Sequence, residues 1–486
     1  MKTIAEHSTI PVIKHDRGVC HMYVDTEADP SMAERLCLNA KVQRPSTCNA
    51  METLLVHEAV APVFVPPMIA KYQSAGVEIR DNQIESVERS EGRDLGLRVF
   101  VGQSSAIVSA SRFEPDDLEA IAERAVEMAR AAPPDPYDGL ADEADIARDT
   151  PALDLADEAS PTADDLLALA RTAEAAGLAV EGVTKSSGAS ASASRRAMVL
   201  VASNGFAGSY ARTDYGLSAA LIAGSGTAME RDYDFTSAVH FADLDPAERI
   251  GRQAGERTVH RLGARKAASQ RVPVVFDRRV AGGLMGHLAQ AVVGSAITRA
   301  TSFLKERMGD RLFKPGTSVI DDARLPRGRA SKPFDGEGLP TGRLAVIEDG
   351  VLETWLLDCR SARQLGARST GHASRGIGGP PSPSPTNLYL EPGTISPEAL
   401  ISTIANGFLV TELMGMGVNP VTGDYSRGAA GFWIENGKIA YPVSEVTIAG
   451  NLKDMFLALT PASDLEFRGT INAPTSLVGE MTVAGV

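Results

Sequence analysis

The sequence predicts an α+β protein, in which a mixed N-terminal α/β region precedes a β-rich, largely antiparallel C-terminal domain. Three helical patterns that begin near a proline lie before residue 265, and Asn-Gly or Asp-Gly pairs separate apolar runs further along. The chain has 486 residues, 43% hydrophobic and 23% charged, which is an ordinary globular composition. The domain boundaries that we expect are 1–76, 77–265 and 266–486.

The charge and the apolar runs exclude several classes of protein. A net charge of −14 argues against a protein that binds nucleic acid, because the phosphate backbone requires a basic surface. No apolar run reaches the roughly 18–20 residues of a membrane span. Residues 1–7 contain no apolar stretch of signal-peptide length. We therefore expect a soluble, cytoplasmic protein without direct contact to nucleic acid or membrane.

The first 76 residues alternate short apolar runs with helical patterns. Strands are expected at 10–13, 20–24 and 53–56, because these runs are short and apolar. Helices are expected at 31–42 and 64–74, the second despite two prolines. A polar loop at 43–49 joins the first helix to the third strand.

Between 77 and 265 the pattern becomes one of hairpins and helices. A hairpin is expected at 77–88, and strands at 95–101 and 106–110. A helix begins at Pro115, with an apolar stripe of Leu118, Ile121, Ala125 and Met128. Further helices begin at Pro161, with Gly177 beyond its end, and near Pro246. The acidic segment 135–160 is expected to be a surface connection.

Turn pairs that favour positive φ angles predict three hairpins. They are Asn204-Gly205, Asp349-Gly350 and Asn436-Gly437, each flanked by apolar runs. One helix, at 279–296, interrupts the β-rich part. The stretch 371–385 is dense in Gly, Ser and Pro and is expected to be a long loop of functional importance.

Few residues carry a chemical signal of their own. Phosphate-binding loops, nucleophile elbows and paired metal-binding histidines are absent from the sequence. His287, on the 279–296 helix, and His372, in the Gly-rich loop, are lone histidines; such residues are more often structural, and we retain both as candidates for a substrate cleft.

The cysteines are Cys20, Cys37, Cys48 and Cys359, and their spacing favours neither disulfides nor a zinc knuckle. Cys48 lies in the polar loop, where a thiol can be accessible. Only Arg44 offers a nearby cation that would lower its pKa, so the local pattern favours a bystander thiol over a nucleophile.

From about residue 81 to 486 the chain resembles the PmbA/TldE branch of the TldD/PmbA metallopeptidase family. The segments that carry this resemblance follow one another in family order. They are 85–96, 273–277, 301–304, 334–338, 369–373, 385–389 and 423–428.

The resemblance implies a cytosolic peptidase built from two related subunits, of which the TldD type binds the metal through HExxxH. In the corresponding helix here, Gly286 and Ala291 stand at the two ligand positions, and His287 stands at the position of the glutamate. We therefore expect no metal, no cofactor and a non-catalytic subunit. Its expected partners are a TldD-like metal-binding subunit, in a homo- or heterodimer, and a peptide substrate.

Residues from about 6 to 76 instead resemble gamma-glutamyl phosphate reductase, a member of the aldehyde dehydrogenase superfamily. The matching segments are 10–13, 18–25, 39–49 and 52–56. In that family Cys48 would be the nucleophile that forms a thioester before hydride transfer. The join near 75–78 is then a natural fusion, an engineered join or an assembly artefact. We expect the helix at 63–76 to replace in part a family helix, and the residues before about Val56 to be an under-packed appendage.

The function expected from the sequence is that of a PmbA/TldE-like subunit acting in the proteolysis of peptides or unfolded proteins. Two alternatives remain. One is an NADPH-dependent glutamate-5-semialdehyde dehydrogenase remnant that uses Cys48, and the other is a peptide-binding scaffold without a proteolytic role.

Overall fold

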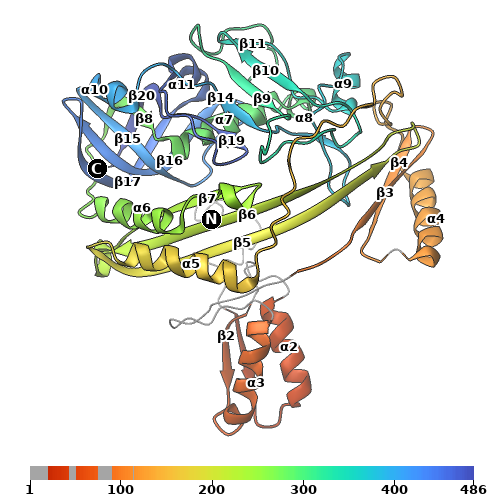
Figure 1. Ribbon diagram of the computed structural model, residues 1–486, viewed down its shortest axis with the longest axis horizontal. Coiled ribbons are helices and arrows are strands. Elements are labelled where there is room, and N and C mark those ends of the chain that lie inside the picture. The colour runs from red at the N-terminus through yellow and green to blue at the C-terminus, as the bar shows by residue number, and fades with distance from the viewer. Residues whose placement is uncertain (1–19, 43–50, 75–89, 113, 486) are drawn as a thin grey trace, which may run out of the picture. The chain divides into compact units, whose positions relative to one another are not determined.

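The computed structural model describes residues 20–42, 51–74, 90–112 and 114–485, and it divides into two compact units, Met1–Gly92 and Arg93–Val486 (Figure 1). Each unit has its own buried cluster or clusters. The strand expected at 10–13, the hairpin expected at 77–88 and the loop with Cys48 lie outside the described residues.

The described part of the first unit has two strands and two helices. β1 (Cys20–Val24) pairs in parallel with β2 (Met51–Val56), and the helices are α2 (Pro30–Val42) and α3 (Ala61–Ser74). These elements confirm the strands expected at 20–24 and 53–56 and the helices expected at 31–42 and 64–74. Its buried residues are Val24, Ala33, Cys37, Met51 and Met68.

The apolar side of α3 packs inside this first unit. Met68 is 1% exposed and, with Phe64, belongs to the cluster formed by residues of β1, α2 and β2. The apolar side chains of this helix complete the core of the segment that precedes it, and the expectation that it takes the place of a family helix stays a prediction. Residues before Val56 are likewise part of that core.

The second unit begins with a hairpin and the helix that covers it. β3 (Leu95–Val101) and β4 (Ser104–Ala110) are antiparallel, and α4 (Pro115–Ala131) has proline in its first turn, as predicted. The predicted apolar stripe of α4 is wrong in part. Leu118 and Met128 are 43% and 47% exposed, whereas Ile121, Ala125 and Ala129 are buried. This i, i+4, i+8 stripe faces the hairpin through mostly small side chains.

The acidic segment before the next helix is not merely a surface connection. Ala141, Ile146, Leu153 and Leu155 are all buried. Ala141 and Ile146 join a cluster that includes Phe206 and other residues of the central hairpin and the C-terminal domain. Single apolar residues spaced along a coil leave no periodicity, so the sequence pattern did not reveal these anchor points.

A three-stranded antiparallel sheet lies at the centre of the second unit. Its strands are β5 (Val183–Val201), β6 (Ala207–Ala223) and β7 (Glu230–Ala238), in that order. α5 (Ala163–Leu178) and α6 (Ala247–His260) cover one face, where Leu217 and Leu221 are buried. β5 and β6 extend well beyond these two helices (Figure 1).

The β5–β6 turn differs from the expected two-residue turn. Only Gly205 has a positive φ, of 94°, and the backbone hydrogen bond that closes the loop joins the N–H of Ala202 to the carbonyl of Phe206. The other two turn predictions are confirmed. Asp349-Gly350 and Asn436-Gly437 all have positive φ angles, as the tight turns require.

The contact between α5 and α6 depends on glycines. Gly177 lies within α5, not beyond its end as expected, and it is buried. A Cβ on Gly251 of α6 would lie 1.8 Å from the carbonyl oxygen of Ala173. The two helices therefore approach closely because these positions lack side chains.

The C-terminal domain contains two larger sheets. Apolar residues of α7 (Arg278–Val292) are buried in the same core as residues of both sheets. The first has the order β17-β16-β15-β8-β20-β18 and the second β11-β10-β9-β14-β19. Most pairs are antiparallel, which confirms the predicted fold class. The strands are β8 (Gln270–Phe276), β9 (Val319–Asp322), β10 (Arg343–Glu348), β11 (Val351–Leu352), β14 (Leu388–Leu390), β15 (Asn406–Met414), β16 (Asp424–Glu435), β17 (Lys438–Asn451), β18 (Thr460–Pro461), β19 (Ile471–Asn472) and β20 (Ser476–Ala484).

The remaining elements of this domain are short. The helix expected at 279–296 is two helices, α7 and α8 (Gly294–Thr298), because Val293 between them is extended. The loop expected at 371–385 contains only two short antiparallel strands of two residues each, β12 (Ala373–Ser374) and β13 (Ser382–Pro383). The other helices are α9 (Cys359–Leu365), α10 (Pro397–Ser402) and α11 (Leu452–Ala458). In the part of the chain that the structure describes, no helix is both long and apolar enough to cross a membrane.

Candidate functional site

The helix that would carry the metal motif, α7, lacks the side chains for it. Asp277 caps the helix by accepting a hydrogen bond from the N–H of Arg279. Gly286 has no side chain, and Ala291 is 3% exposed within the main core. Catalytic zinc needs about three nitrogen, oxygen or sulfur ligands and a bound water. Among the described residues no group of three or more His, Cys, Asp or Glu side chains could hold a metal ion.

His287 lies on α7 beside two residues of β16. Its ring is 5.9 Å from that of Tyr425, in an edge-on arrangement. Burial lowers the pKa of His287, and the positive charge of Arg427 lowers it further. Burial raises the pKa of Tyr425 to about 12, although Arg427 opposes this shift. A neutral imidazole beside a guanidinium is a poor place for a metal cation, because the two positive charges repel each other.

His372 lies inside the C-terminal domain, not at its surface. It is 2% exposed, and Asp321, its partner, is 0% exposed. The Nε2 atom is 3.2 Å from a carboxylate oxygen of Asp321, and Nδ1 is 2.8 Å from the carbonyl oxygen of Thr370. The backbone N–H of Thr386 donates to the second oxygen of Asp321 at 2.7 Å. This network joins the Gly-rich loop to β9 around a buried imidazole.

A second cluster of buried polar residues lies around Glu337, for which no sequence pattern predicts a role. Its carboxylate accepts a hydrogen bond from the N–H of Cys359 at 2.8 Å. Burial raises the pKa of Glu337 to about 7 and raises the pKa of the Cys359 thiol. The neighbouring Asp335 accepts three backbone N–H groups, those of Glu337, Leu339 and Ala373. These hydrogen bonds connect the turn at 334–338 to the segments that carry Cys359 and Ala373.

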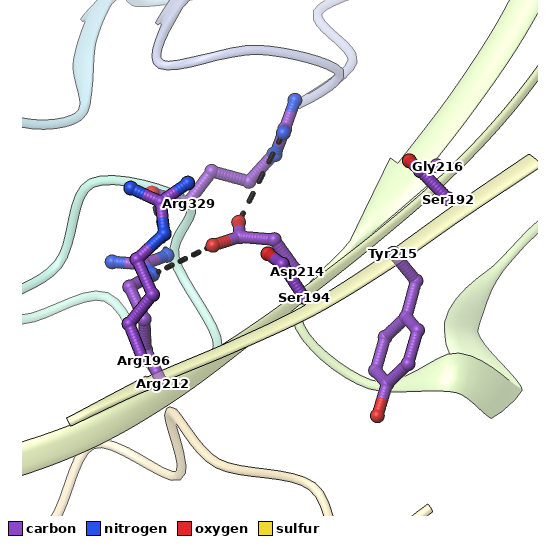
Figure 2. A pocket seen from close by; sticks show the side chains of 8 residues that line it. All are labelled: Ser192, Ser194, Arg196, Arg212, Asp214, Tyr215, Gly216 and Arg329. Atoms are coloured by element: carbon purple, nitrogen blue, oxygen red, sulfur yellow. Dashed lines mark hydrogen bonds and ion pairs between the residues drawn. The ribbon is translucent and has the colours of Figure 1, made fainter. Parts of the chain in front are cut away.

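A pocket of about 470 Å³ lies on the face of β5 and β6 opposite the helices. Figure 2 shows Arg196, Arg212 and Asp214 gathered above the strands, with Tyr215 pointing the other way. The full lining is Ser192, Ser194, Arg196, Arg212, Asp214, Tyr215, Gly216 and Arg329. No local sequence pattern indicates this pocket, because its residues come from two strands and a distant loop.

Of the sequence-predicted residues, the structure describes His287 and His372 but not Cys48. The two histidines lie in separate environments, one beside β16 and the other against β9. Neither of them lines the pocket on β5 and β6.

Comparison with known proteins gives matches along most of the chain. Three family models match in order, those of PmbA/TldA metallopeptidase domain 1 at 69–129, the central domain at 156–262 and the C-terminal domain at 269–485. A similar protein is the "Metalloprotease PmbA" of Escherichia coli O157:H7. It is 36% identical over 457 residues, which is 94% of this chain and 100% of that protein.

A solved structure and a short second match complete the comparison. A Bacteroides thetaiotaomicron protein, described as a candidate modulator of DNA gyrase, has a TM-score of 0.74 at 28% identity and covers 80% of this chain and 88% of its own. The gamma-glutamyl phosphate reductase of Thermodesulfovibrio yellowstonii is 58% identical over 80 residues, or 16% of this chain and 19% of the reductase. The chain therefore belongs to the PmbA/TldD metallopeptidase family and carries a short N-terminal segment similar to gamma-glutamyl phosphate reductase.

Proposed function

We propose that this chain is the non-catalytic, PmbA/TldE-like subunit of a two-subunit cytosolic metallopeptidase. In this proposal it holds peptides or unfolded protein for a TldD-like partner that carries the metal. The single observation that supports it most is the composition of α7, in which Gly286 and Ala291 occupy the two ligand positions.

The surroundings of α7 add to this support. A Cβ on Gly286 would be in ordinary contact with Ile471, 4.0 Å away, and Ala291 is buried in the main core, so neither position presents a side chain that could ligate a metal. The imidazole of His287 is paired with the ring of Tyr425 and stands near Arg427. A general base needs access to the water or proton that it acts on. A half-buried imidazole with a lowered pKa beside a guanidinium suits a structural role better.

The contribution of this chain would be to bind and orient the substrate. The outer face of β5 and β6 offers serine hydroxyls and guanidinium groups beside the loop that carries Arg329. Orientation of a substrate is a large part of catalysis, since a well-placed group gains several kcal/mol relative to a diffusing one, about 7–11 in favourable cases. The metal, its ligands and the water would come from the partner.

We further propose that the residues before 77 are a passenger with respect to this function, followed by family regions at 77–265 and 266–486. The chain spans about a fifth of the reductase that it matches. Reductase chemistry needs a cofactor site and a substrate pocket in register with the nucleophile. The match around Cys48 covers too little of the reductase to contain both, and a reductase function remains the weaker proposal.

Metal content tests the proposal directly. We expect the purified chain to contain no stoichiometric zinc by elemental analysis, because a zinc site needs ligands that α7 lacks. A family member that carries HExxxH, purified in the same way, is the positive control. One zinc per chain that survives dialysis against a weak chelator would contradict the proposal, since a structural or catalytic ligand set binds zinc tightly.

A further inference from the structure

We propose that the pocket on β5 and β6 is an oxyanion site that receives the C-terminal carboxylate of a bound peptide. This inference rests on the proposed function for the identity of the ligand, but the site itself follows from the side chains that line the pocket. The residues that carry the argument are Arg196, Arg329, Ser192 and Ser194, with Asp214 as the opposing charge.

The strand register places the polar residues on one face. Arg196 lies opposite Arg212, Ser194 opposite Asp214 and Ser192 opposite Gly216. Alternate side chains of a strand share a face, so these residues form one continuous polar surface. A Cβ on Gly216 would lie 3.0 Å from the hydroxyl oxygen of Ser192, so the glycine keeps this end of the pocket open.

The third arginine comes from a loop that is firmly held. Arg212 donates to the carbonyl oxygens of Arg329 at 2.6 Å and of Gly328 and Ser331 at 3.3 Å. The N–H of Ala330 donates to the side-chain oxygen of Asn387 at 2.8 Å. These bonds fix the loop backbone against β6. Arg329 is therefore held in place before any ligand arrives, which lowers the entropic cost of binding.

The charges in the pocket do not balance. Asp214 accepts a hydrogen bond from Arg212 at 3.1 Å and is 4.0 Å from Arg329. Arg196 makes no hydrogen bond or ion pair within the described part of the chain. One carboxylate thus faces three guanidinium groups, in a protein whose net charge is −14. A local excess of positive charge of this kind attracts an anion.

Residues that line the pocket carry hydrogen-bond donors without a partner among the described residues. The Nη1 atom of Arg329 donates to the hydroxyl of Ser237 at 2.6 Å, but its Nε atom is buried without a partner among the described residues. Burial lowers the pKa of Arg329, with Arg212 adding to that shift and Asp214 opposing it. The hydroxyls of Ser192 and Ser194 also lack partners in the described residues. Guanidinium forks with neighbouring hydroxyls are well suited to an oxyanion.

The shape of the pocket favours a carboxylate attached to a larger molecule over a free ion. Its volume of about 470 Å³ is much larger than an inorganic anion needs. The walls beyond the arginines are formed by serine and glycine, which can accommodate an adjoining residue and backbone. Asp214 also opposes a doubly charged phosphate more strongly than a singly charged carboxylate.

The test measures binding of a labelled peptide to the whole chain by fluorescence anisotropy, with the peptide as a free acid or as a C-terminal amide. We expect the free acid to bind about tenfold more tightly, as one charge-assisted contact is worth roughly a factor of ten. Arg196→Gln and Arg329→Gln should each abolish most of this preference. Asp214→Asn should increase the affinity for the acid, a gain that misfolding cannot produce.

Arg195→Gln is the matched control. Arg195 is next to Arg196 on β5 and donates to the carbonyl oxygen of Asp157 at 3.0 Å. Its replacement removes the same charge from the same strand, and we expect it to preserve the preference for the free acid. Equal effects of Arg195→Gln and Arg196→Gln would overturn the inference, because they would reflect net charge alone.

Inorganic phosphate separates the two sources of an oxyanion. If phosphate binds in an Arg196-dependent manner while acid and amide peptides bind equally, the peptide assignment is wrong. Equal binding of both peptides without any effect of phosphate would also overturn the inference. The assay contains neither metal nor partner, so its failure is distinct from failure of the proposed function, which is judged by partner-dependent cleavage.

Discussion

At the residue scale, the contacts of a histidine in the fold indicate its role better than its position in the sequence does. His372 stands in a Gly-rich loop that reads as a ligand-binding segment, yet it is 2% exposed. Its ring nitrogens face the carboxylate of Asp321 and the carbonyl of Thr370. We therefore propose that it holds the loop and does not contact a substrate. The sequence could not reveal this, because Asp321 lies far away in the chain.

This reading predicts a large loss of stability for His372→Ala. The substitution leaves the buried carboxylate of Asp321 with only its Thr386 contacts, and removing a hydrogen-bond partner from a buried charged group costs about 3 kcal/mol. Urea unfolding monitored by circular dichroism measures the effect. His260→Ala, at the exposed end of α6, is the control and should change stability by no more than about 0.5 kcal/mol. Equal small effects for both variants would contradict the structural role of His372.

Glu337 gives a prediction about pH. Its pKa is raised from 4.5 to about 7 by burial, so the folded state binds more protons than the unfolded state between these values. Stability should therefore fall as the pH rises from about 4.5 to 7 and stay level above, by roughly 1–3 kcal/mol in total.

Glu337→Gln should remove this part of the pH dependence. The amide oxygen can still accept the N–H of Cys359, and the variant should be more stable than the parent at pH 8 but similar at pH 4. Thermal unfolding across this pH range is the measurement, with Glu119→Gln on the exposed side of α4 as control. A variant that is less stable than the parent at pH 8 would show that the carboxylate is stabilising in its ionised form.

At the element scale, the signals for where helices and hairpins begin were reliable, and the signals for which side faces the core were less so. Proline in the first turn located α4, and the positive φ angles of Asn436-Gly437 formed the expected turn. The predicted buried side of α4 is wrong at Leu118 and Met128, which are exposed. Local residues determine a cap or a turn, whereas the hairpin that packs on α4 determines its buried side.

The glycines between α5 and α6 provide a test at this scale. Gly251→Ala places a Cβ where the carbonyl oxygen of Ala173 lies only 1.8 Å away, so the helices must separate. We expect a loss of about 3 kcal/mol, as for severe overpacking in a core. Gly283→Ala on α7 is the matched control, because nothing lies within 4 Å of its Cβ.

The control should be neutral or should stabilise the protein by up to about 1 kcal/mol, as alanine favours the helix. Denaturant unfolding of both variants provides the comparison. If Gly251→Ala lowers the free energy of unfolding no more than Gly283→Ala does, α5 and α6 do not approach as closely as described.

At the scale of the whole molecule, the sequence predicted the fold class but not the sheets. The turn pair Asn204-Gly205 indicates a central hairpin but not its length, and β5 has 19 residues and β6 has 17. Polar and small residues in those strands hide the alternation that marks a strand. β8 pairs with β15 and β20, strands that follow it by well over a hundred residues. Such pairings and the pocket with Arg196 and Arg329 depend on long-range contacts that local patterns do not encode.

The N-terminal segment is also explained at this scale. The sequence located its reductase-like character, and the comparisons confirm that similarity. The structure adds that Met68 and its neighbours complete a core within the first unit. Truncation before Val56 would therefore expose apolar side chains of α3, contrary to the expectation that the preceding residues are under-packed.

Reconstituted peptidase activity tests the central claim, that this chain serves a metal-bearing partner. The assay compares the chain alone, an HExxxH-bearing family member alone and the mixture, on an unfolded protein substrate. We expect strong, chelator-sensitive cleavage only in the mixture, and none when the glutamate of the partner's motif is replaced. His287→Ala and Cys48→Ala should leave the activity of the mixture unchanged. Cleavage by this chain alone, insensitive to chelator or lost with Cys48→Ala, would contradict the account.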